Sequence, residues 1–152
     1  MLNKEFALKI NLVVLALVGA MDLIRGFMHT YQVKYAAVNL AGIEPLSDSL
    51  VLMGAFGISN FLTGFIYFLI IWKAPKLAPY ILLLIPISYF IGGLGFQGYQ
   101  GVQMESAFRG QYMMSKYLLA CLVSALLYFL SRPKKTKAKT YEPKIEENML
   151  VE

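Results

Sequence analysis

The chain has 152 residues and a net charge of +5, and 58% of its residues are hydrophobic while only 15% are charged. This composition is not that of a soluble domain, because the apolar residues lie in long uninterrupted blocks. A membrane-spanning helix needs about 20 mostly apolar residues. We therefore predict an all-α integral membrane protein, an antiparallel four-helix transmembrane bundle. Its spans are expected at residues 8–28, 49–72, 78–97 and 112–131 of a single domain, residues 1–131.

The first span contains ionisable residues at membrane depth. Residues 10–29 are apolar enough for lipid, yet they include Asp22, Arg25 and His29. At about 100° per helical residue, Arg25 lies about 60° and His29 about 20° from Asp22. Asn11 also falls within about 20° of Asp22. These four polar side chains should share one stripe, and such groups usually face a bundle interior or a water-filled cavity.

The second span, residues 49–72, contains several small residues. Gly54, Gly57 and Gly64 predict a flat surface that lets another helix approach closely, because no hydrophobic force drives helices together in lipid. We interpret Asn60, near the same face, as an interhelical hydrogen-bonding residue rather than a catalytic one.

The third span, residues 78–97, contains two prolines. Pro79 fits the first turn of a helix. Pro86 lies inside the span, and it should kink the helix because a backbone hydrogen bond is lost there.

The positive charge is distributed unevenly between the connections. Both termini and the second connection, residues 73–76, carry the excess of lysine and arginine, so we expect both termini to be cytoplasmic in the cell membrane. Residues 132–152 turn from basic to acidic and predict a disordered cytoplasmic tail, whose lysine cluster we interpret as a topology signal rather than as a site for anionic lipid. No basic face interleaved with aromatic residues occurs elsewhere, so nucleic acid is not an expected partner.

This topology places Asp22 about 24 Å from the inner end of its helix, in the outer leaflet. A second polar region, between the third and fourth spans, should lie at the same level. The candidate ligand-binding residues are therefore Asp22, Arg25 and His29 with Gln97, Gln100, Glu105, Arg109 and Lys116.

Two interpretations of these residues stay open. In the first, Arg25 would hold an anionic or carbonyl group, His29 would exchange protons and Asp22 would orient one of them. In the second, the charges neutralise each other and only hold four helices in register. A Cys121–His29 pair is disfavoured because the two residues lie at different depths, and a single histidine and a single cysteine do not predict a metal site.

The layout of four short spans, a charged first helix and cytoplasmic termini resembles that of small DoxX-type membrane proteins. The resemblance lies in the hydropathy profile and the glycine-bearing second span. This chain has Asn60 where that pattern suggests a more strongly ionisable residue. The resemblance implies a four-span membrane fold, and we transfer no activity from it.

No phosphate-binding glycine loop, nucleophile elbow or dinucleotide fingerprint is present, so no cofactor is predicted. Our first hypothesis is a non-enzymatic membrane protein whose outer-leaflet polar pocket binds or helps move a small molecule or lipid. The second is an accessory subunit that packs against a membrane-protein partner or its own copies through the glycine-bearing second span. The third is a small membrane enzyme acting on a lipid or quinone-like substrate with Arg25 and His29.

Overall fold

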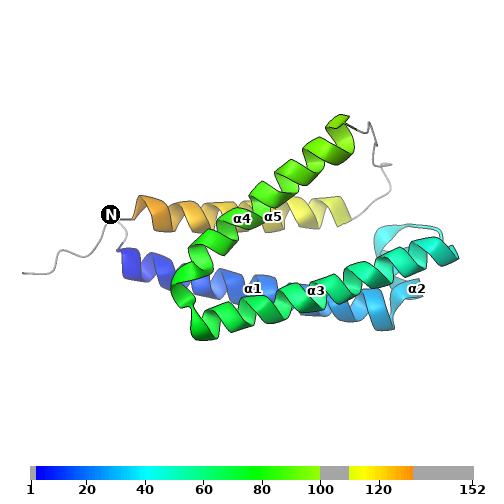
Figure 1. Ribbon diagram of the computed structural model, residues 1–152, viewed down its shortest axis with the longest axis horizontal. Coiled ribbons are helices and arrows are strands. Elements are labelled where there is room, and N and C mark those ends of the chain that lie inside the picture. Colours follow the sequence, from blue (N-terminus) through cyan, green and yellow to red (C-terminus); the bar gives the residue numbers. More distant parts are fainter. Residues whose placement is uncertain (1–2, 100–109, 132–152) are drawn as a thin grey trace, which may run out of the picture.

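The computed structural model describes residues 3–99 and 110–131, and these are almost entirely helical (Figure 1). Within them, four helices are long and apolar enough to cross a membrane, which confirms the predicted all-α class and the four apolar helices. The expectation of a disordered tail concerns residues 132–152, which lie outside the described part of the chain. The long helices are α1 (Lys4–Tyr31), α3 (Ser47–Lys73), α4 (Ala78–Gly93) and α5 (Gly110–Leu130).

Short helical elements occupy the described connections. After α1 come α2 (Val33–Tyr35) and the π-helical η1 (Ala36–Ala41), which ends where Gly42 adopts a φ of 70° that favours glycine. The 3-10 turn η2 (Pro75–Leu77) joins α3 to α4, and the π-helical η3 (Leu94–Tyr99) follows α4.

Helix α1 is the central element, because it contacts the three other long helices. Its buried residues recur at three- and four-residue intervals, as expected of a helix with one face in the core. This face supplies Leu15 and Val18 to a core that also contains Leu82 of α4 and Cys121 and Ala125 of α5. The buried residues of α1 are Ala7, Asn11, Leu15, Val18, Gly19, Asp22 and Gly26.

Helices α1 and α3 pack through glycines spaced seven residues apart on each helix. A Cβ added to Gly64 would lie 3.0 Å from the backbone oxygen of Gly19. A Cβ added to Gly57 would lie 3.1 Å from the backbone oxygen of Gly26. Residue numbers therefore rise along α1 while they fall along α3, and the two backbones approach where side chains are absent. Gly57 and Gly64 are thus already covered by α1 and are not free to contact another protein.

Helix α4 leaves the end of α3 and diverges from it. It packs mainly against α5 and has few contacts with α3 (Figure 1). The side chains of Tyr89, Phe90 and Ile91, near the far end of α4, are exposed. Residues of both α3 and α4 line the cavity that is described below.

A buried asparagine ties α1 to α5. Asn11 is fully buried, and its Nδ2 donates to the backbone oxygens of Ala7 at 2.8 Å and Ser124 at 2.9 Å. Asn11→Ala is expected to lower the free energy of unfolding by about 1–2 kcal/mol, because an interhelical hydrogen bond is lost and a small void is created. Titration with a denaturing detergent in mixed micelles would measure this loss.

Asn39→Ala is the matched control for that measurement. Asn39 is exposed, and its amide donates only to Tyr35, four residues earlier, so a change within about 0.5 kcal/mol is expected. Equal losses for the two variants would contradict a special role for the Asn11 bond.

Candidate functional site

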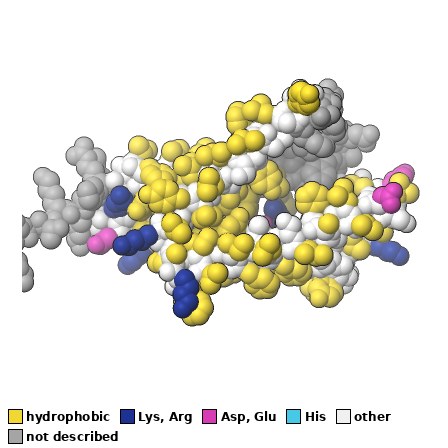
Figure 2. Space-filling model, viewed as in Figure 1, with side chains coloured by type: hydrophobic (Ala, Val, Ile, Leu, Met, Phe, Trp, Pro, Cys, Tyr) yellow, Lys and Arg dark blue, Asp and Glu magenta, His cyan; other side chains and the backbone are white. Residues whose placement is uncertain are grey.

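A cavity of about 370 Å³ lies among α1, α3, α4 and α5. Its described lining contains one carboxylate, one amide and six hydroxyl-bearing side chains, together with apolar residues such as Phe56 and Leu84. Figure 2 shows hydrophobic side chains over much of this face, charged side chains toward both ends, and a hollow near the centre in which a basic group is visible. The cavity lining thus combines polar and apolar side chains.

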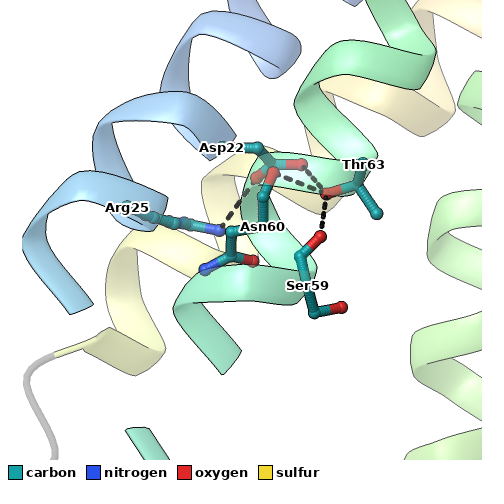
Figure 3. A network of polar contacts seen from close by, with 5 residues as sticks. All are labelled: Asp22, Arg25, Ser59, Asn60 and Thr63. Atoms are coloured by element: carbon teal, nitrogen blue, oxygen red, sulfur yellow. Dashed lines mark hydrogen bonds and ion pairs between the residues drawn. The ribbon is translucent and has the colours of Figure 1, made fainter. Parts of the chain in front are cut away.

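Asp22 of α1 is the carboxylate of this chamber. Only 5% of the residue is exposed, and its Oδ1 lies 3.7 Å from Nη1 of Arg25, one helical turn further along α1. Its Oδ2 lies 3.2 Å from Oγ1 of Thr63 on α3 (Figure 3). The Arg25 guanidinium also stands 5.2 Å from the ring centroid of Tyr117 on α5. Three helices therefore converge on one ion pair.

The hydroxyl group of Thr63 is shared among three acceptors. Its Oγ1 lies 3.2 Å from Asp22 Oδ2, 3.2 Å from the Ser59 backbone oxygen and 3.0 Å from the Asn60 backbone oxygen. A hydroxyl has one hydrogen, so it can serve only one of these acceptors at a time. An ionised carboxylate offers about four lone-pair sites. Thr63 can donate only one hydrogen, and Arg25 at 3.7 Å lies beyond hydrogen-bond distance. The Asp22 carboxylate therefore has unused acceptor capacity.

Tyrosines from three helices add hydroxyl groups to the lining. They are Tyr67 of α3, Tyr89 of α4 and Tyr117 of α5. Tyr67 and Tyr117 share a side-chain hydrogen bond. A tyrosine presents an apolar ring and a polar tip, so these residues can border both a polar head group and an alkyl chain. The lining accordingly brings apolar rings and hydroxyl groups together.

The sequence-predicted residues of α1 take different positions. Asp22 lines the cavity, and Arg25 lies directly beside Asp22. His29 lies further along, between α1 and α3, where a Cβ on Gly57 would come 3.0 Å from the His29 Cβ. The Nδ1 of His29 is buried and has no hydrogen-bond partner among the described residues. His29 is not among the described lining residues of the cavity.

The predicted residues from the second polar region are largely outside the described structure. Gln100, Glu105 and Arg109 fall in residues 100–109, and Gln97 belongs to η3, with only its backbone described. Lys116 is exposed on α5 and is not among the described lining residues.

Sequence reasoning missed the residues of α3 that complete the site. Asn60, Thr63 and Tyr67 follow one another at three- and four-residue spacing, which places polar groups on a single face of a helix. That stripe is a recognisable signal in an apolar segment. In the sequence, the glycines of the same helix predicted only helix packing. The glycine face and the polar face of α3 lie next to each other.

The site lies close to the middle of α3. Asn60 is the central residue of Ser47–Lys73, and Thr63, which contacts Asp22, is three residues further along. An ionisable group is most expensive near the centre of a spanning helix.

Within residues 3–99 and 110–131, no three His, Cys, Asp or Glu side chains gather in a way that could hold a metal ion. No protein-family model, no curated protein and no solved structure matches the chain. The resemblance in hydropathy to DoxX-type proteins therefore has no family match beside it. The cavity and its lining residues are therefore the basis for a proposed function.

Proposed function

We propose that this protein is an antiparallel four-span membrane bundle, kinked at Pro86 and with cytoplasmic termini, that binds an amphipathic small molecule or lipid. The polar head group occupies the cavity beside Asp22, and the apolar part extends between α3 and α4 into the bilayer. The observation that supports this proposal is a cavity of about 370 Å³ whose described lining combines a carboxylate and six hydroxyl-bearing side chains with apolar residues. This volume falls in the range of about 300–1,000 Å³ that ligand pockets occupy.

A purely structural clamp would require fewer polar groups than this lining contains. The ion pair, Thr63 and the Tyr117 ring connect α1, α3 and α5, yet Ser88 and Tyr89 of α4 also border the cavity. Polar groups inside a membrane protein cost free energy unless they are hydrogen-bonded, and lipid chains cannot supply those hydrogen bonds. A bound polar head group would satisfy them.

Filling the cavity tests the proposal. In Ser88→Trp a large side chain enters the chamber, and we expect the amount of co-purifying amphipathic molecule, measured by native mass spectrometry in mild detergent, to fall at least about tenfold. A tenfold loss of affinity corresponds to about 1.4 kcal/mol. The steric penalty of an indole ring in this cavity should exceed that value.

Ile87→Trp is the matched control, because Ile87 is the exposed neighbour of Ser88 and is not among the described lining residues. It should retain the parent's complement of bound molecules. Failure to find any co-purifying amphiphile, or equal retention in the two variants, would refute binding in this cavity.

No observation favours the alternative functions equally. An accessory subunit that docks through the glycines of α3 would compete with α1 for Gly57 and Gly64. An enzyme using Arg25 and His29 together would need both groups at one substrate, whereas Asp22 is the charged group among the described lining residues.

A further inference from the structure

The charge balance around the cavity restricts the ligand. Asp22 and Arg25 form a neutral pair with 3.7 Å between Oδ1 and Nη1, and the described lining includes no basic side chain. A charged head group would leave this neutral chamber with a net charge near the middle of α3. Uncompensated charge is costly both in a protein interior and at membrane depth. The cavity therefore suits an uncharged head group.

The hydrogen-bonding pattern restricts the ligand further. Asp22 has unused acceptor capacity, because Thr63 has one hydrogen for three acceptors and Arg25 Nη1 lies beyond hydrogen-bond distance. A head group that carries O–H can donate to Asp22 and accept from a tyrosine hydroxyl. An ether or ester head group can only accept hydrogen bonds. Beside Asp22 it would place an oxygen lone pair against a lone pair of the carboxylate.

The apolar part of the ligand has a defined exit. Phe56 of α3 and Leu84 of α4 line the cavity, and both side chains are more than half exposed. They belong to α3 and α4, two helices that diverge from each other and have few mutual contacts (Figure 1). An alkyl chain leaving the cavity would pass between them and stay in contact with lipid.

Resting on the proposed function, we infer that the ligand is an uncharged, hydroxyl-bearing amphiphile, the class of long-chain alcohols and of mono- and diacylglycerols. Its hydroxyl donates to the carboxylate of Asp22, and its hydrocarbon chain leaves between α3 and α4. Arg25, whose Nη1 lies 3.7 Å from Asp22 Oδ1, balances the charge of the carboxylate.

Four photoactivatable probes with the same diazirine-bearing alkyl chain test this inference. Their head groups are a primary alcohol, its methyl ether, an ammonium and a carboxylate. We expect the alcohol to label cavity-lining peptides of the purified full-length protein about tenfold more than each other probe, since one hydrogen bond to a charged group accounts for that factor. Labelling is read by mass spectrometry of the digested protein.

Two variants examine the role of the carboxylate. Asp22→Asn leaves Arg25 without its counter-charge and adds an N–H donor, so the alcohol preference should disappear and the carboxylate probe should gain. Thr63→Val removes a hydroxyl but retains the carboxylate, so it should keep the alcohol preference. The comparison of the four probes on the parent protein does not depend on either variant being folded.

The outcomes separate this inference from the proposed function. Strongest labelling by the ammonium probe would mean that Asp22 recognises a cation, and equal labelling by all four would mean that no head group is selected. Either result overturns the inference but leaves the proposed function standing, provided that Ser88→Trp abolishes the labelling. Labelling that Ser88→Trp does not reduce, or none in the cavity, refutes both.

Discussion

Arg25→Met is expected to lower the free energy of unfolding by about 3 kcal/mol, because it leaves the Asp22 carboxylate buried without its counter-charge. Asp22 is 5% exposed and the Arg25 side chain 21%, so most of the water that could solvate the carboxylate is excluded. Methionine keeps the length and apolar stem of arginine, so the lost charge dominates the effect. Unfolding by a denaturing detergent in mixed micelles would measure it.

A double variant separates the charge from the packing. Asp22→Asn combined with Arg25→Met removes both charges, so the loss should be smaller than for Arg25→Met alone. Lys9→Met is the matched control, since Lys9 is an exposed residue of the same helix and a change within about 0.5 kcal/mol is expected. The ion pair would have no structural role if Arg25→Met and Lys9→Met cost the same.

Gly64→Leu is expected to destabilise the protein by about 2–3 kcal/mol through overpacking between α1 and α3. A Cβ at this position would lie 2.8 Å from Leu23 Cδ2 and 3.0 Å from the Gly19 backbone oxygen. The leucine side chain can move, but the backbone of α1 cannot withdraw without opening the interface. The same unfolding measurement applies.

Gly92→Leu is the control for the glycine experiment. No heavy atom lies within 4 Å of a Cβ built at Gly92, an exposed residue of α4. Leucine is a better helix former than glycine, so this variant should be as stable as the parent or more stable. If Gly64→Leu were tolerated as well as Gly92→Leu, the close approach of α1 and α3 would be wrong.

The glycine contacts and the contact between Asp22 and Thr63 both lie in the α1–α3 interface. Gly19 and Gly26 let the backbones of the two helices approach, and Asp22, between them, reaches Thr63 across the same interface. The close approach brings a short side chain such as aspartate within 3.2 Å of its partner. Loss of either glycine contact is therefore expected to weaken the polar contact too.

Part of the candidate site could be identified from the sequence. Asp22 and Arg25 are conspicuous because charged residues in an apolar segment cost free energy in the membrane, so such residues usually have a functional or structural role. The partners of Asp22 were not identifiable in the same way. Thr63 and Tyr67 are ordinary residues of a spanning helix, and their importance depends on which helix packs against them. Depth counting suggested partners at residues 97–116, most of which lie outside the described residues, and the described interhelical hydrogen bond of Asp22 comes from Thr63 of α3.

The sequence by itself determined the four apolar helices, because the length and hydropathy of a segment decide locally whether it can cross a membrane. It also determined that Asp22 and Arg25 lie one helical turn apart, since helical periodicity is a local property. Only the tertiary structure decided that the glycines of α3 pack against α1 and that α4 diverges from α3 to leave a cavity. Those features depend on which helices become neighbours. Because every apolar helix surface is equally stable in lipid, small differences in helix–helix packing select the neighbours.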